Sequence, residues 1–252
     1  MSRPWQALAE EAAALWRRAG CVIALTGAGV SVPSGIPDFR SPGGLWARYD
    51  PAEVATIQAL RQRPKRVWEF IREAVLVFGQ ARPNAAHRAL AALEASGRLE
   101  AVITQNIDNL HQEAGSRRVI EFHGSGKRFY CMDCRKQFDP AGAASIAAEA
   151  LPWRCDACSG VIRPDFVFFG EQIPTAALSE SLELAGRADL AVIVGTSGEV
   201  APANSIPYQV KAAGGKVVEI NLGASSYAGL PDVVLRAPAE EVLPVLEELL
   251  LG

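Results

Sequence analysis

The chain has 252 residues, of which 49% are hydrophobic and 21% charged, and its formal net charge is −3. This length allows one large domain, or one large and one small domain, with a sizeable core. The charge argues against a protein that wraps nucleic acid by neutralising phosphates, and no stretch approaches the ~18 apolar residues of a membrane span. The N-terminal segment has the pattern of an amphipathic helix and lacks the apolar region of a signal peptide, so we expect a cytoplasmic protein.

Short runs rich in Val and Ile predict strands, in chain order, at 21–25, 101–103, 119–122, 190–194, 217–220 and 233–235. Their nearly continuous apolar character is typical of strands covered on both faces, as in a parallel sheet. Helical patterns accompany them at 5–19, 84–97, 176–186, 203–213 and 239–251. This alternation predicts an α/β fold with a Rossmann-like, doubly wound parallel sheet.

Two segments interrupt the alternation, and both are interpreted as insertions into the sheet domain. Residues 41–80 are predicted to be helical, and residues 124–163 are rich in cysteine and loop signals, with a helix in the Ala-rich stretch 141–150. The sheet domain is then discontinuous and comprises residues 1–40, 81–123 and 164–252.

Four of the five cysteines form two Cys-x-x-Cys pairs, Cys131/Cys134 and Cys155/Cys158, separated by 20 residues. This spacing favours one structural zinc ion, because two tight turns can point four thiolates at a tetrahedral site. The alternatives are two disulfides, which are rare in the expected compartment, or four unrelated buried thiols. The segment 124–163 carries six basic and four acidic side chains, a weak footprint for nucleic acid, so we expect no direct binding of nucleic acid.

Polar or glycine-rich residues follow five of the predicted strands directly. They are Thr26-Gly27-Ala28-Gly29, Thr104-Gln105-Asn106, His123-Gly124, Gly195-Thr196-Ser197 and Asn221. The carboxyl ends of parallel strands lie at one edge of a sheet, where ligands bind. One such terminus alone could be a turn or a helix cap, but five predict a shared binding cleft.

The glycine loop after the first strand suggests a phosphate-containing ligand. Gly27 and Gly29 allow a close backbone approach, and N–H groups at a helix start favour phosphate. Val32 stands where a strict G-x-G-x-x-G pattern needs glycine, so the loop alone is weak evidence for a dinucleotide. The stretch 34–40 resembles a mobile lid in which Arg40 could meet phosphate, or else an ordinary surface loop.

The three histidines differ in their expected roles. His87 follows a probable helix start and is expected in the core, and His111 could pack or support the site. His123 ends a strand at the shared edge, where an imidazole can act as a general base near neutral pH. From spacing alone this is only slightly favoured over a satisfied polar residue.

Taken together, these motifs resemble the sirtuins, NAD-dependent protein-lysine deacylases, of the bacterial or archaeal type. The resemblance is carried by GAGVSVPSGIPDFR, GLW at 44–46, TQNIDNLH, the His123-Gly124 pair, the twin CxxC, RPDFVFFGE at 163–171, GTS at 195–197 and Asn221, in order along most of the chain. It implies NAD as co-substrate, one structural zinc and acyl-lysine proteins or peptides as substrates.

The resemblance also implies roles for individual residues. The acyl oxygen attacks the ribose carbon, nicotinamide leaves, and His123 acts as base on a ribose hydroxyl that attacks the resulting imidate, with Asn106 as second catalytic residue. The products are free lysine and O-acyl-ADP-ribose. The implied NAD-binding residues are Gly27, Ala28, Gly29, Ser31, Ile36, Asp38, Phe39, Arg40, Gln105, Asn106, Asp108, Gly195, Thr196, Ser197 and Asn221.

For the substrate, the resemblance implies a peptide that binds as an added strand between Phe168-Phe169-Gly170-Glu171 and Gly198-Glu199-Val200. Sirtuins that prefer negatively charged acyl groups resemble one another in a Tyr-x-x-Arg pair on the helix after GLW. The corresponding stretch 67–73 has no such pair, so we expect a deacetylase or apolar deacylase rather than a desuccinylase. The competing functions are mono-ADP-ribosyl transfer and a non-catalytic NAD-sensing or zinc-ribbon interaction module.

Overall fold

The computed structural model describes residues 4–38 and 44–252. Its main feature is a six-stranded sheet in the order β3-β2-β1-β7-β8-β9, in which every neighbouring pair is parallel. The strands are β1 (Val22–Thr26), β2 (Ala101–Thr104), β3 (Val119–Glu121), β7 (Leu190–Val194), β8 (Lys216–Ile220) and β9 (Val233–Leu235). All six strands predicted from the apolar runs are therefore confirmed.

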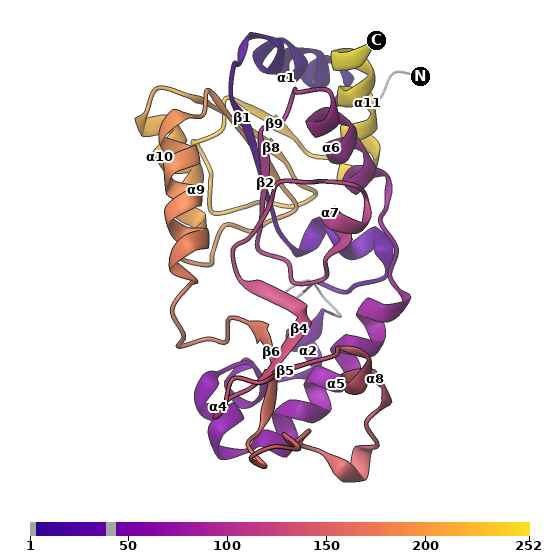
Figure 1. Cartoon of the computed structure of the whole chain (residues 1–252). Helices are drawn as coiled ribbons and strands as arrows, with labels where there is room; N and C mark the ends of the chain where they lie inside the picture. Colours follow the sequence, from indigo (N-terminus) through magenta and orange to yellow (C-terminus); the bar gives the residue numbers. More distant parts are fainter. Residues whose placement is uncertain (1–3, 39–43) are drawn as a thin grey trace.

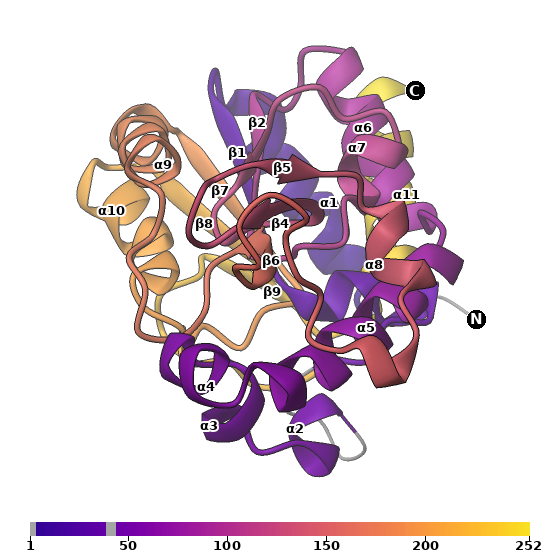
Figure 2. The same cartoon turned by 60° about the horizontal axis from the view of Figure 1, so that its bottom comes forward.

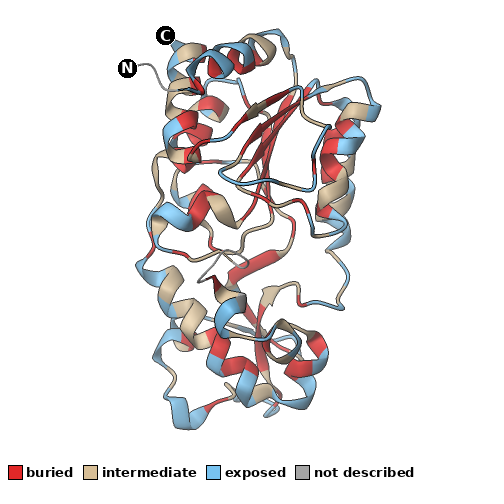
Figure 3. Cartoon of the chain, turned by 180° about the vertical axis from the view of Figure 1, so that it is seen from behind, coloured by how far each residue is buried: buried red, intermediate tan, exposed pale blue. Residues whose placement is uncertain are grey.

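Helices cover both faces of this sheet, because successive strand residues point to opposite sides and all of β1 is buried. On one face, Val22 and Ala24 pack with α1 (Gln6–Arg18), α6 (Ala85–Ala95) and α11 (Ala239–Leu251). On the other face, Ile23 and Leu25 pack with α9 (Thr175–Arg187) and α10 (Ile206–Ala212), which follows a short turn η3 (Ala203–Ser205). The predicted doubly wound α/β sheet is confirmed, and Figure 3 shows its strands as the buried centre of the larger body.

The two insertions lie together at one end of the molecule (Figures 1 and 2). The first is helical, as predicted, with α2 (Leu45–Arg48), α3 (Pro51–Val54), α4 (Ile57–Gln62) and α5 (Pro64–Gln80). The second contains an antiparallel sheet in the order β5-β4-β6, built from β4 (Gly124–Cys131), β5 (Gln137–Phe138) and β6 (Ile162–Phe166). The loop signals of this segment did not predict that sheet.

One hydrophobic core joins the two insertions. Trp68 of α5 is fully buried and donates its indole N–H to the carbonyl of Ile162 at 2.8 Å. It packs edge-on against Trp153, with the ring centroids 5.9 Å apart. The Ala-rich stretch is shorter as a helix than predicted, with α8 (Ala141–Ser145) followed by a 3-10 turn η2 (Ala148–Ala150). The predicted boundary at 163/164 falls inside β6, a strand of the smaller sheet.

Two local features complete the fold. Cys21, predicted within the first strand, lies just before β1 and is only half-buried. Within the described parts of the chain, no helix combines the length and the apolarity needed to cross a lipid bilayer.

Candidate active site

The strand order reverses between β1 and β7, and the loops that leave these two strands are in direct backbone contact. Gly29 donates its N–H to the carbonyl of Gly195 at 2.8 Å, and Gly195 has a φ of +60°. A Cβ on Gly27 would lie 2.7 Å from the Cβ of Thr196, closer than real side chains approach. The glycines thus let two loops meet at the switch point, where ligands of such sheets bind. This packing is a second reason for the glycine loop, beyond the phosphate contact that the sequence suggests.

Asn106 and Asp108 extend from the loop after β2 toward the glycine loop. Asn106 donates from Nδ2 to the carbonyl of Gly27 and to Ser31 Oγ, both at 3.1 Å. Ser31 in turn donates to Asp108 Oδ2 at 2.7 Å, and the Leu110 N–H donates to Asp108 Oδ1 at 2.9 Å. Ser31 lies in the 3-10 helix η1 (Ala28–Ser34), and Leu110 begins α7 (Leu110–Glu113). Burial of Asp108 raises the pKa of its carboxyl, and these two hydrogen bonds oppose that rise.

Two buried histidines, His87 and His111, lie beside Ser31 and Thr26. His87 accepts the Asn84 N–H at Nδ1, which completes the N-terminal cap of α6, so its proton sits on Nε2, 3.5 Å from Ser31 Oγ. His111 Nε2 is 3.0 Å from Thr26 Oγ1, and the two imidazole rings are 4.8 Å apart. Burial lowers the pKa of His87 to about 4 and that of His111 well below its usual value, so both are neutral at pH 7. His87 is in the core, as predicted, and also supports the polar cluster.

His123 lies between β3 and β4 at the same edge of the sheet and is half-buried. Its Nδ1 is 3.1 Å from the carbonyl oxygen of Gln105, which can only accept, so Nδ1 carries the proton. The lone pair therefore belongs to Nε2. Burial lowers the pKa of His123, partly offset by this hydrogen bond, so the imidazole is neutral near pH 7. A neutral imidazole with a fixed tautomer has the properties of a general base.

Thr196 joins the loops on the β7 side of the switch point. Gln105 donates from Nε2 to Thr196 Oγ1 at 3.0 Å, and Asn221 donates from Nδ2 to the Thr196 carbonyl at 2.8 Å. Asn221 also contacts the buried Glu219 carboxylate at 3.4 Å, which forms an ion pair with Arg236 at 2.9 Å. The structure thus links the loops after β2, β7 and β8 through side-chain hydrogen bonds.

The four paired cysteines form a compact cluster in the smaller body. Their sulfurs all lie within 4.8 Å of one another, and the cysteines are not joined as disulfides. The Cys131–Cys158 and Cys134–Cys155 sulfur distances are 3.4 and 3.6 Å. Zn–S bonds of about 2.3 Å in a tetrahedron need sulfurs about 3.8 Å apart, so the cluster fits one zinc ion. The predicted zinc site is confirmed, and its two alternatives are not.

Comparison with known proteins identifies the family. Residues 27–202, more than half of the chain, match the Sir2 family. The chain belongs to the Sir2 family. It is 47% identical over 239 residues to the NAD-dependent protein deacylase of Thermococcus kodakarensis, and the match covers 93% of each protein.

Solved Sir2 structures share the whole fold. A Sir2–p53 peptide–NAD+ structure has a TM-score of 0.86 at 38% identity, covering 94% of this chain and 96% of that chain. A Sir2 variant with a deacetylated p53 peptide and 3'-O-acetyl ADP ribose has a TM-score of 0.89 at 38% identity, covering 95% and 97%. The family predicted from the motifs is confirmed.

Most of the residues that the Sir2 resemblance implies lie on one rim in the structure. The hydrogen-bonded or contacting set comprises Gly27, Gly29, Ser31, Gln105, Asn106, Asp108, His123, Gly195, Thr196 and Asn221. Ala28 is the first residue of η1, and the buried Ile36 lies two residues after the end of η1. Phe39 and Arg40 lie outside the described residues. Individual NAD contacts therefore stay predictions.

The predicted peptide-binding segment of this Sir2 protein already makes contacts within the chain. The backbone N–H and carbonyl of Phe169 bond to Ala55 and Ile57 of the helical insertion at 2.9 and 3.1 Å. Glu171 forms an ion pair with Arg163, whose side chain is 5% exposed. In the other predicted segment, the Gly198 carbonyl accepts a hydrogen bond from the Ser226 hydroxyl at 2.5 Å. An added strand must therefore use other backbone groups of the two segments.

Several supporting contacts were missed from the sequence. Thr26 and Thr104 were predicted at the ends of two strands, but the hydrogen bond that joins their hydroxyls at 2.9 Å was not. Glu219 is a lone carboxylate inside an apolar run, and this anomaly could have pointed to its buried ion pair with Arg236.

Proposed function

We propose that this Sir2 protein removes acetyl or related apolar acyl groups from protein lysine side chains in an NAD-dependent reaction. The products are nicotinamide, free lysine and O-acyl-ADP-ribose. The Thermococcus relative, named an NAD-dependent protein deacylase, and the Sir2 structures with peptide, NAD+ and acetyl ADP ribose support the activity. The observation that carries it is the fixed tautomer of His123 beside the polar loops of the switch point.

His123 is the proposed general base. Its Nδ1–H is held by the Gln105 carbonyl at 3.1 Å, which orients the ring and leaves Nε2 able to accept a proton. Because burial lowers its pKa, the imidazole is neutral at pH 7. Bound NAD would supply an electrophilic ribose carbon to the acyl oxygen, with nicotinamide as the leaving group. His123 then takes a proton from a ribose hydroxyl, which makes that oxygen nucleophilic toward the acyl carbon.

Asn106, Asp108 and Ile36 are proposed to hold the nicotinamide end. Asp108 accepts one hydrogen bond at each carboxylate oxygen, from Ser31 and Leu110, and each oxygen retains a lone pair for an amide N–H. Asn106 is anchored by its Nδ2, which leaves its amide oxygen as an acceptor for a ribose hydroxyl or a water. The remaining residues named by the resemblance, Phe39 and Arg40 included, keep their proposed roles toward NAD.

The zinc ion has a structural role in this proposal. Four thiolates, Cys131, Cys134, Cys155 and Cys158, would complete its coordination and leave no position for substrate. Cys131 and Cys155 are buried in the core shared with α5, so the ion stabilises the small body. We propose the division into an NAD-binding domain (1–40, 81–123 and 164–252), a helical insertion (41–80) and a zinc-binding module (124–163).

The acyl-lysine peptide is proposed to lie as a strand between 168–171 and 198–200. We also propose a cytoplasmic location without direct binding of nucleic acid or membrane. The four cysteines support this location, because that compartment keeps thiols reduced and available to metal.

The test is mass spectrometry of an acetyl-lysine peptide incubated with the protein, with and without NAD. We expect deacetylated peptide, nicotinamide and O-acetyl-ADP-ribose only when NAD is present. Unchanged peptide would contradict the proposal, and ADP-ribose attached to the peptide would instead identify a transferase.

A further inference from the structure

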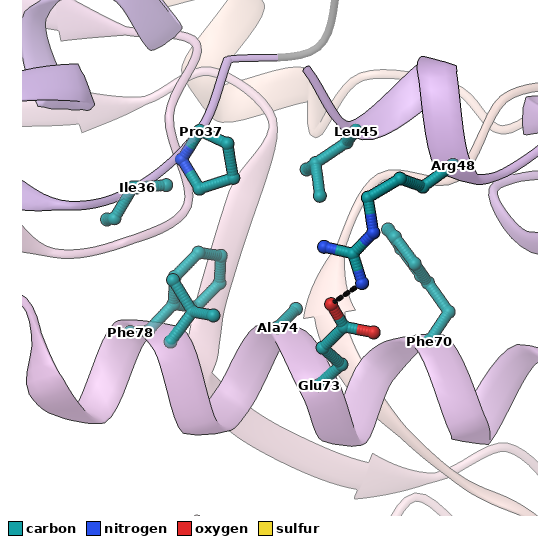
Figure 4. Close-up of a pocket in the computed structure, with 9 residues that line it drawn as sticks. Ile36, Pro37, Leu45, Arg48, Phe70, Glu73, Ala74 and Phe78 are labelled. Carbon is teal, nitrogen blue, oxygen red and sulfur yellow. Dashed lines mark hydrogen bonds and ion pairs between the residues drawn. The ribbon is translucent and has the colours of Figure 1, made fainter. Parts of the chain in front are cut away.

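A small cavity lies between the NAD-binding loops and the helical insertion. It has a volume of about 40 Å³, more than the about 10–15 Å³ that one water needs. One wall is Ile36 and Pro37, which follow η1, and another is the face of α5 that carries Phe70, Ala74 and Phe78 (Figure 4). The cavity is therefore mostly apolar.

The inner end of this cavity reaches the proposed catalytic loops. A ring carbon of Phe78 lies 3.2 Å from the point where a Cβ would stand if Gly126 had a side chain. Gly126 donates its N–H to the Ile107 carbonyl at 2.9 Å. Ile107 lies between Asn106 and Asp108, and Ile36 packs in one small core with Leu110. An acyl chain that extends past the nicotinamide end would enter this space.

Arg48 and Glu73 are the only charged groups among the described residues that line the cavity, and Figure 4 shows them hydrogen-bonded to each other. Glu73 of α5 accepts a hydrogen bond from the Arg48 guanidinium at one oxygen and from the Tyr49 hydroxyl at the other. The Tyr49 ring packs edge-on against Phe70 at 5.1 Å, which fixes the hydroxyl. The hydrogen bond from Tyr49 lowers the pKa of Glu73, so the carboxylate is charged at neutral pH.

We propose that Glu73 determines acyl selectivity by occupying the two groups, Arg48 and Tyr49, that would otherwise bind an acyl carboxylate. The inference rests on the proposed function. An arginine and a tyrosine are well suited to bind a carboxylate. Here both come from the end of α2, and not from the stretch 67–73 of α5. With Glu73 in place, a succinyl carboxylate would meet a like charge and donors that are already bonded. An uncharged acyl chain meets no such repulsion.

The experiment compares three versions of one peptide, with acetyl-lysine, succinyl-lysine or the uncharged terminal amide of succinyl-lysine. The last two have nearly the same size and differ in charge, so their kcat/KM ratio within one variant isolates the carboxylate. The proteins compared are wild type, the single variant Glu73→Gln and the double variant that combines Glu73→Gln with Arg48→Gln. The single variant Glu69→Gln is the matched control. Glu69 lies one turn earlier on α5, pairs with Arg66 at 3.3 Å and does not line the cavity.

We expect the succinyl-to-amide ratio to rise about tenfold in Glu73→Gln, as for one added charged hydrogen bond at a half-exposed site. Arg48→Gln should remove this gain, and Glu69→Gln should leave the ratio at the wild-type value. An unchanged ratio in an active Glu73→Gln enzyme, or an equal rise in Glu69→Gln, would overturn the inference and leave the proposed function standing.

Two further outcomes are separable. If Glu73→Gln does not fold, as judged by circular dichroism, the single variant Arg48→Gln provides the test. Without its Arg48 partner, the Glu73 carboxylate must repel the succinyl group more strongly and lower the succinyl-to-amide ratio below that of wild type. An unchanged ratio there would overturn the inference. If wild type consumes none of the three peptides with NAD, the proposed function fails and the inference fails with it.

Discussion

Replacing Gly195 by alanine tests the contact between the two loops at the switch point. The new methyl group would lie 2.5 Å from the Val30 nitrogen and 2.7 Å from the Gly29 carbonyl carbon. Both are backbone atoms, so no side chain can rotate away to relieve the overlap. The φ of +60° at Gly195 is a conformation that alanine adopts only with strain.

The expected cost combines two effects. Left-handed backbone costs about 1–2 kcal/mol for a non-glycine residue, and overpacking costs about 1–3 kcal/mol, so we expect a loss of about 2–5 kcal/mol in the free energy of unfolding. For a chain of this size, each kcal/mol corresponds to about 2–4 °C in Tm, and the melting temperature should fall by about 4–20 °C. Separation of the loops would also displace Asn106, which is anchored to Gly27, and a displacement near 1 Å can reduce kcat/KM about a hundredfold.

Thermal unfolding by calorimetry and steady-state deacetylation measure the two effects on the same sample. Gly186→Ala is the matched control, because Gly186 lies in α9 with nothing within 4 Å of the added methyl group. We expect that control to be stabilised by about 0.5–1 kcal/mol and to keep wild-type activity. A Gly195→Ala protein that melts and turns over like wild type would refute the argument that these loops must touch.

Three further predictions concern the histidines and the zinc site. His123→Ala should reduce kcat about 10²- to 10⁴-fold with unchanged Tm and zinc content, and full activity in a folded, metal-loaded variant would contradict its role. The free energy of unfolding should fall as pH falls from about 6.5 to about 4, because unfolded histidines bind protons there that buried His87 and His111 do not. His87 alone accounts for on the order of 3 kcal/mol, Asp108 acts in the opposite direction, and a denaturant titration of His87→Gln that keeps the wild-type pH slope would contradict the assignment. Cys134→Ser should lose tightly bound zinc and lower the Tm, measured by metal analysis and calorimetry, whereas full zinc content would exclude Cys134 as a ligand.

The main sheet was predictable because its strands carry their own signal. A strand covered on both faces must be apolar throughout, and β1 and β7 are buried at every position. β4 and β6 gave no such signal. β4 carries Lys127 and Arg128 at positions that are not buried, and β6 contains Arg163 and Pro164, which are buried but interrupt any apolar run. Their pairing depends on contacts with α5 that no local pattern encodes.

The site was predictable as a set of strand ends but not as a network. The rule that ligands bind at the carboxyl ends of parallel strands brings His123 and Asn106 to one edge without knowledge of strand order. The hydroxyl pair of Thr26 and Thr104 needs the register that sets these two residues opposite each other. The Arg48–Tyr49–Glu73 cluster needs two separate helices to pack together.

We propose that the His123 imidazole faces the ribose next to the leaving nicotinamide. A crystal structure of the protein with NAD and an acetyl-lysine peptide tests it most directly. We predict His123 Nε2 within about 2.6–3.2 Å of a hydroxyl of that ribose, with Nδ1 still bonded to the Gln105 carbonyl. An imidazole turned away from the ribose, with other residues between them, would contradict the account.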